Sequence, residues 1–111
     1  MKYHAHIYWK NPREREVAMW LRTYLHDNGC ALGRVWEKPI GPHPLPMYQV
    51  MYDDSNKECI EKYLGNKELT VLLHEDIGDN HVRDHTEGAR WIGTPLALDL
   101  EFLEKLDQGD F

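Results

Sequence analysis

The chain has 111 residues, of which 41% are hydrophobic and 29% charged, and its formal net charge is -6. This length fits one domain, spanning residues 1–111, with a single hydrophobic core. No apolar run approaches the ~20 residues that a membrane helix needs, and lysine and arginine form no patch of the kind that binds nucleic acid. The first residues lack the apolar segment of a secretory signal, so we expect a cytoplasmic protein with neither membrane nor nucleic acid as a partner.

The hydrophobic pattern predicts six regular elements. Residues 3–9 alternate between apolar and polar positions, which is typical of a half-buried strand. Asn11 is a good N-cap and Pro12 a good first residue for a helix that Gly29 ends. The other elements are a strand over residues 31–37, a strand over Met47–Tyr52, a helix that is capped by Asp54 or Ser55 and ends at Gly65, and a strand over Leu69–His74.

This order predicts an α+β fold of the ferredoxin-like type, βαββαβ, with a four-stranded antiparallel sheet and two helices on one face. In the usual arrangement of this fold, the strands lie in the order 4-1-3-2. Cys59 is expected on the buried, apolar side of the second helix. Residues 75–95 are expected to form an irregular polar loop, and the apolar residues from Leu96 onward a C-terminal extension that packs back as a short strand or helix.

Six of the seven histidines fall into three clusters, at residues 4–6, 43 and 74–85. His4 and His6 face the same way, because successive side chains of a strand alternate between its two faces. The predicted strand order puts His74, at the end of the fourth strand, beside them. Packing requires no such gathering of imidazoles, so this sheet corner is a predicted metal site. The loop after it can bring further ligands over the corner, namely Asp76, Asp79, Asp84 and His85.

His43 lies between two prolines that stiffen the connection over residues 38–46. By strand order this loop lies at the far end of the first strand. His43 therefore reaches the predicted site only if the loop folds over the sheet face, or if a dimer partner supplies it; otherwise it is an incidental surface residue. Imidazoles and carboxylates suit iron(II), zinc, copper or nickel, and the absence of cysteine ligands disfavours structural zinc. Tyr48 either lines a pocket for an aromatic ligand or packs in the core.

Four segments, taken in chain order, resemble the fungal-type DOPA 4,5-dioxygenase family. The resemblance runs from about residue 3 to residue 100 and rests on Tyr3–Tyr8 (YHAHIY), Gly41–Val50 (GPHPLPMYQV), Leu69–His74 (LTVLLH), and Asp84–Thr86 (DHT) followed by Ala89–Gly93 (ARWIG). It implies a ferredoxin-like fold and homodimers. It also implies non-haem iron(II)-dependent extradiol cleavage of a catechol such as L-DOPA, with dioxygen as the second substrate.

The resemblance further implies roles for individual residues. His6, His74 and His85 are expected to bind Fe(II), with zinc or another divalent metal as the alternative occupant. Asp84 is expected to orient His85, and either Asp84 or Asp79 is an alternative to one of the histidine ligands. The remaining assignments are acid–base catalysis by His4 and His43, and substrate binding by Tyr48 and Arg90.

Two other classes of function stay open. The first is a non-catalytic metal- or small-ligand-binding dimer module, which would differ from the enzyme in lacking an open coordination position for a catechol. The second is a structural dimer whose histidines are buried where two sheets meet. The natural catechol and the position of ring cleavage, 4,5 or 2,3, also stay open.

Overall fold

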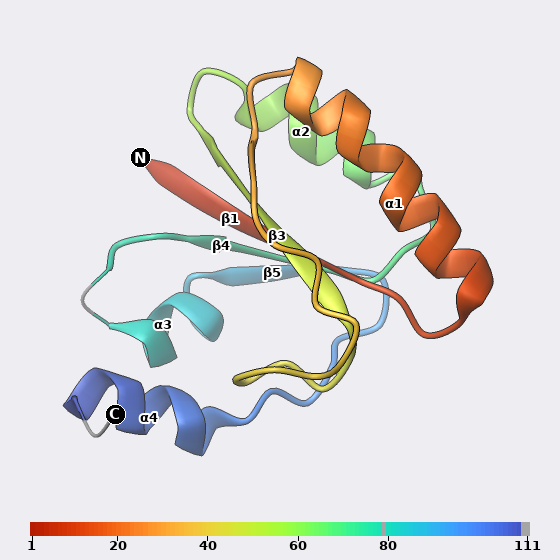
Figure 1. Cartoon of the computed structure of the whole chain (residues 1–111). Helices are drawn as coiled ribbons and strands as arrows, with labels where there is room; N and C mark the ends of the chain where they lie inside the picture. The colour runs from red at the N-terminus through yellow and green to blue at the C-terminus, as the bar shows by residue number, and fades with distance from the viewer. Residues whose placement is uncertain (79, 110–111) are drawn as a thin grey trace.

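The structure is a computed structural model that describes residues 1–78 and 80–109. Its strands form one antiparallel sheet in the order β2-β3-β1-β4-β5. α1 and α2 cover one side of the sheet, and α3 and α4 lie on the other (Figure 1). In chain order the elements are β1 (Lys2–Tyr8), α1 (Pro12–Asp27), β2 (Ala31–Leu32), β3 (Met47–Asp53), α2 (Lys57–Leu64), β4 (Val71–Glu75), α3 (His81–His85), β5 (Ala89–Ile92) and α4 (Leu100–Gln108).

The α+β class and the order of the four predicted strands are confirmed, but the prediction of four strands is wrong. A fifth strand, β5, pairs with the outer side of β4, with Trp91 opposite Leu72 and Ala89 opposite His74. The irregular loop predicted over residues 75–95 is therefore wrong as well, because this stretch contains both α3 and β5. Neither element is long enough to show a hydrophobic period in the sequence.

The start of α3 is held by side chains from two directions. Asn80 Oδ1 accepts a hydrogen bond from the Arg83 N–H at 2.9 Å. The Asp107 carboxylate of α4 accepts from the N–H groups of His81 and Val82 at 2.6 and 3.0 Å. A helix of five residues is marginal alone, so α3 depends on these contacts. The contact with Asp107 joins residues far apart in the chain, which explains why local sequence gave no sign of the helix.

The second strand is much shorter than predicted, spanning only Ala31–Leu32. The N–H of Gly33 donates to the Gln49 carbonyl at 2.7 Å, and the chain then leaves β3 until an isolated bridge joins Trp36 to Met47. A Cβ on Gly33 would lie 2.8 Å from the Gln49 oxygen, so only glycine permits this approach. Beyond the bridge at Trp36 the chain no longer pairs with β3, so the loop over residues 38–46 can turn away from the edge of the sheet.

Two details of the predicted helices differ in the structure, namely the N-cap of α2 and the burial of Cys59. Asn11 caps α1 as predicted, accepting from the Glu14 N–H at 2.9 Å. In α2 the N-cap is Asn56, and neither Asp54 nor Ser55 takes this position. Cys59 is exposed, which contradicts the prediction. It precedes the buried Ile60 by one residue, and one residue is a rotation of ~100° around a helix.

The C-terminal extension packs back as a helix, α4. Asp99 Oδ1 accepts from the Phe102 N–H at 3.1 Å at its start, and Gly109 follows its end with a φ of 75°. No helix among residues 1–78 and 80–109 is long and apolar enough to span a bilayer.

The sheet has buried apolar residues on both sides. Toward α1 and α2, the main core includes Ile7, Val50 and Leu73, which pack with residues of both helices. On the opposite side a smaller apolar cluster forms around Tyr8, Met47 and Leu72, and its partly buried members include Trp36, Trp91, Leu96 and Leu98. This second cluster covers one end of the sheet face that carries the histidines, and so shields that end from water.

Candidate active site

Five histidines gather in two overlapping groups, and they are His4, His6, His43, His74 and His85. In β1, His4 and His6 alternate with Ala5 and Ile7 of the main core, so they lie on the face of the sheet turned away from α1 and α2. In the pairing of β1 with β4, His4 lies directly opposite His74, and His6 lies one step further along the same face opposite Leu72. The strand order therefore brings His4, His6 and His74 together, as the sequence predicts. His85 reaches the group from α3.

His43 reaches the same group within a single chain. The loop over residues 38–46 folds across the sheet face, where the Asp99 N–H donates to the Pro42 carbonyl at 2.9 Å. The His43 ring then lies 4.3 Å from the His6 ring, measured between centroids, and is 7% exposed. Of the two routes left open by the sequence, the fold over the sheet face is the one observed, and no partner chain is needed to supply this residue.

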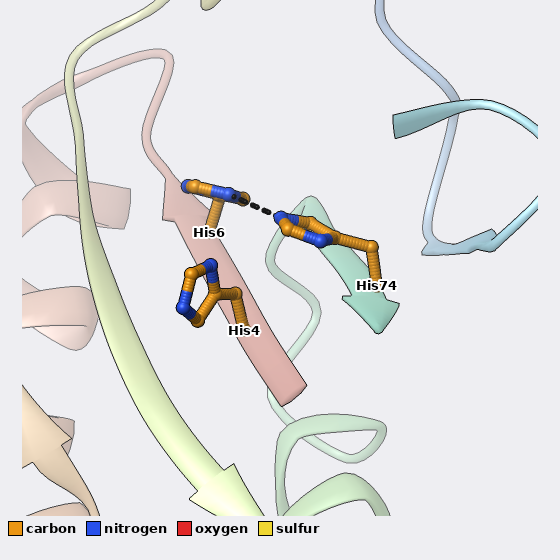
Figure 2. A group of neighbouring side chains, drawn as sticks. All are labelled: His4, His6 and His74. Carbon is orange, nitrogen blue, oxygen red and sulfur yellow. Dashed lines mark hydrogen bonds between the residues drawn. The ribbon is translucent and has the colours of Figure 1, made fainter. Parts of the chain in front are cut away.

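The contacts among the five imidazoles are close. His6 Nε2 and His74 Nε2 lie 2.9 Å apart, with His4 below them on the same strand as His6 (Figure 2). The rings of His74 and His85 are 4.2 Å apart. Two sets of three have ring nitrogens all within 4.8 Å of one another, His4 with His6 and His74, and His6 with His43 and His85. His6 is the residue common to both sets.

Backbone carbonyls fix the tautomers of two of these rings. His74 Nδ1 lies 2.8 Å from the Glu75 carbonyl, and His85 Nδ1 lies 2.8 Å from the His81 carbonyl. A carbonyl can only accept, so each Nδ1 carries the hydrogen and each neutral ring keeps a lone pair on Nε2. Such a hydrogen bond from the distant nitrogen is the usual support of a metal-binding histidine.

His6 has a nitrogen without a partner. His74 Nε2 can only accept in the neutral ring, so the short contact requires His6 Nε2–H to donate to it. His6 Nδ1 is then a buried lone pair with no hydrogen-bond donor among the described residues. A buried polar atom left unpaired costs about 1–3 kcal/mol, which a bound cation would offset.

Burial keeps the cluster uncharged. It lowers the pKa of His74 to about 3 and that of His43 to about 4, with His85 adding to both effects. The pKa of His6 is lowered well below its usual value, first by burial and then by the four neighbouring imidazoles. Burial likewise lowers the pKa of His4 and of His85, against the opposing effect of nearby carboxylates. Neutral imidazole is the form that binds metals.

The carboxylates lie at the edge of this cluster. His4 Nε2 is 3.2 Å from Asp76 Oδ2, although the two are not aligned for a hydrogen bond. Asp84 is buried and accepts from the Ile77 N–H at 3.2 Å. The expectation that Asp84 orients His85 is wrong, because the His81 carbonyl holds that ring instead. Asp79 lies outside the described residues.

The sequence model of the Dopa 4,5-dioxygenase family matches residues 3–102 of the chain. The chain belongs to this family. A protein of Amanita muscaria named DOPA 4,5-dioxygenase is 30% identical over 110 residues, which cover 89% of this chain and 48% of the relative. An uncharacterized 21.2 kDa protein of Botryotinia fuckeliana is 30% identical over 116 residues, covering 95% of this chain and 63% of the relative. The chain thus spans 48% and 63% of the lengths of these two curated relatives.

A solved structure is also similar to this member of the Dopa 4,5-dioxygenase family. The crystal structure of a candidate dioxygenase from Nostoc punctiforme superposes with a TM-score of 0.87 at 38% sequence identity, and the match covers 95% of this chain and 92% of the other. The family, the Amanita muscaria relative and the Nostoc punctiforme structure all carry the name of a dioxygenase.

Two residues expected to bind substrate in this Dopa 4,5-dioxygenase family member lie on the other face of the sheet. Tyr48 is fully buried in the main core, and its hydroxyl donates to the Ala18 carbonyl of α1. Arg90 pairs with Leu73 in the sheet and forms a salt bridge with Glu61 of α2. The structure does not bring either side chain to the histidines, because alternate residues of a strand face opposite sides.

Tyr8 is a residue that the sequence placed on the histidine side without assigning it a role. Its hydroxyl lies 2.7 Å from His43 Nδ1, and its ring stacks at 6.0 Å on that of Trp91. Tyr8 is two residues from His6 in a strand, so the alternation of side chains already indicated that it lies on the same face as His6. Trp91 gave no such signal, because it lies in the stretch that reads as a polar loop.

Proposed function

We propose that this protein is a non-haem iron(II)-dependent extradiol dioxygenase that cleaves a catechol ring with dioxygen. The observation that supports the proposal best is the buried group of neutral imidazoles centred on His6. Neutral imidazoles gathered in this way form a donor set suited to a divalent transition metal. When bound, iron(II) supplies the redox chemistry that allows dioxygen to react with a catechol.

The ligands in this proposal are His6, His74 and His85. Carbonyl hydrogen bonds to Nδ1 leave Nε2 of His74 and of His85 without a hydrogen, and the buried Nδ1 of His6 has no partner among the described residues. The Nε2 lone pair of His74 accepts from His6 Nε2–H here, and as a metal ligand His74 would give up that hydrogen bond. This set combines His6 and His74, which form one compact group with His4, with His85 from the other group. His4 and His43 are then left for acid–base roles, with zinc or another divalent ion as an alternative occupant of the metal site.

His43 is the proposed base in the reaction. If His43 Nδ1–H donates to the Tyr8 hydroxyl, Nε2 is free to take a proton from a catechol hydroxyl. The imidazolium so formed keeps its hydrogen bond to Tyr8. Burial raises the pKa of the Tyr8 phenol, so this hydroxyl stays protonated and holds the ring in place. His4, beside Asp76, is the second acid–base group of the proposal.

Reconstitution with iron(II) tests the proposal directly. The protein is loaded anaerobically with one equivalent of iron(II), and oxygen uptake and the visible spectrum are then recorded with a panel of catechols in air. We expect oxygen consumption and a yellow ring-cleaved product with at least one catechol. Stoichiometric iron without oxygen uptake from any catechol would instead favour a non-catalytic metal-binding module. Light scattering on the same sample tests whether the protein is a homodimer, as the family resemblance implies.

The Tyr8→Phe variant separates proton transfer from metal binding. Without the hydroxyl, His43 loses its hydrogen-bond partner, and kcat is expected to fall on the order of 100-fold. Iron content is expected to stay at the level of the parent protein, because Tyr8 is no ligand in the proposal. The matched control is Tyr48→Phe, which removes a phenol hydroxyl from the other face of the sheet. Equal effects of the two variants on kcat would contradict the role of Tyr8.

A further inference from the structure

A pocket of about 440 Å³ opens beside His85, between β5 and the extended segment that leads to α4. This volume is within the range of pockets that bind small molecules. Apart from His85 the side chains that shape it are small or apolar, and they include Thr86, Ala89, Trp91, Leu96, Ala97 and Leu98.

The pocket is continuous with the histidine cluster. His85 lines it, and a ring nitrogen of His85 lies within 4.8 Å of nitrogens of His6 and His43. Trp91 forms part of its wall and stacks on Tyr8, whose hydroxyl contacts His43. A flat aromatic ring in this pocket would therefore have an indole beside it and the proposed base and ligands at its end.

The side chains described around the pocket offer no cation to a charged ring substituent of the substrate. Among the described residues, none that lines the pocket is lysine or arginine. Arg90, the one arginine expected to bind substrate, is held by Glu61 on the far side of the sheet. Arg83 of α3 lies outside the lining, and its guanidinium is 3.8 Å from the carboxylate of Asp84. A substituent carboxylate that lost its water here would find no cationic side chain in the described lining to compensate it.

We propose, on the basis of the function proposed above, that the substrate is a catechol with an uncharged, apolar ring substituent such as a short alkyl chain. Trp91, Leu96 and Leu98 bind this substituent through apolar contact. A catechol with a carboxylate on its side chain, as in L-DOPA, is a poor substrate for the same reason.

Two catechols of similar shape test this preference on the iron-loaded full chain. The kcat/KM from oxygen uptake is measured for 4-ethylcatechol and for 3-(3,4-dihydroxyphenyl)propanoate, with L-DOPA and dopamine alongside. We expect 4-ethylcatechol to exceed the propanoate and L-DOPA on the order of tenfold or more. Equal or better turnover of L-DOPA, the propanoate or dopamine would overturn the inference.

A binding measurement keeps this inference separate from the proposed function. If no catechol consumes oxygen, the dioxygenase proposal fails, but the pocket can still be tested by calorimetric titration of the same protein with 4-ethylphenol and 3-(4-hydroxyphenyl)propanoate. Tighter binding of 4-ethylphenol supports an apolar pocket whatever the chemistry. Equal or tighter binding of the propanoate would exclude it.

The Ala97→Arg variant tests whether the pocket beside His85 sets the preference for uncharged catechols. Ala97 is exposed and lines the pocket, so an arginine there adds the missing cation without filling the core. We expect the ratio of kcat/KM for the propanoate over 4-ethylcatechol to rise on the order of tenfold. The control is Thr23→Arg, which adds the same charge to an exposed position of α1 across the sheet. If both variants change the ratio equally, the pocket is not the specificity site.

Discussion

The His6→Ala variant is expected to bind iron(II) on the order of 100-fold or more weakly than the parent protein, and to lose ring cleavage with it. His6 belongs to both compact groups of histidines, so its loss leaves neither group with three ligands. The measurement is iron content after anaerobic loading and desalting, with oxygen uptake on the same sample. His26→Ala is the control, because His26 is an exposed residue in the last turn of α1.

The His6→Ala experiment can be interpreted only if the variant stays folded. His6 is 3% exposed, so its truncation leaves a cavity beside His74 and His43. His6→Gln keeps most of the volume while removing the imidazole, and its circular dichroism and iron content are measured in parallel. A folded His6→Gln protein that retains stoichiometric iron and full activity would contradict the proposed centre.

Variants of the other histidines decide which group holds the metal. If His6, His74 and His85 are the ligands, His85→Ala loses iron while His4→Ala keeps it and loses rate. The reverse pattern would assign the ion to His4, His6 and His74, which are one of the two compact groups.

Part of the site could be predicted from the alternation of side chains along a strand and from the order of the strands in the sheet. Alternation along residues 3–9 fixes His4, His6 and Tyr8 on one face, and the antiparallel pairing of β1 with β4 brings His74 opposite His4. The same rule excludes Tyr48, whose partner across the strands is Ile7 of the main core. The family resemblance implied a role for Tyr48 in substrate binding, but the alternation along the strand decides where its side chain lies.

The rest of the site could not be predicted, because contacts between distant parts of the chain position it. His85 is placed by α3, and α3 is held at its start by Asp107 from the far end of the chain. β5 forms by pairing with β4, and its Trp91 stacks on Tyr8 of β1. The path of His43 depends on the contact between Pro42 and Asp99. Each of these pairings joins residues distant in sequence, so no local pattern could indicate them.

Acidification is expected to destabilise the metal-free protein strongly between pH 7 and pH 5. Burial holds the pKa of His43 at about 4 and that of His74 at about 3, whereas an unfolded histidine titrates near 6.5. The unfolded chain therefore binds more protons than the folded one below pH 6.5, and the free energy of unfolding falls as the pH falls. At pH 5 each of the two residues contributes a loss of about 2 kcal/mol, or about 4 kcal/mol together.

Urea unfolding of chelator-treated protein at pH 7, 6 and 5 measures this loss. The His43→Gln variant is expected to lose about 2 kcal/mol less stability than the parent over that range, while the exposed His26→Gln is expected to behave as the parent. Equal slopes for all three proteins would show that the cluster is not held neutral by burial. Iron(II) at 100 times its Kd is expected to add ~2.7 kcal/mol at pH 7, because it binds the folded state alone. This gain should also disappear toward acid pH, since protons and the ion compete for the same imidazole lone pairs.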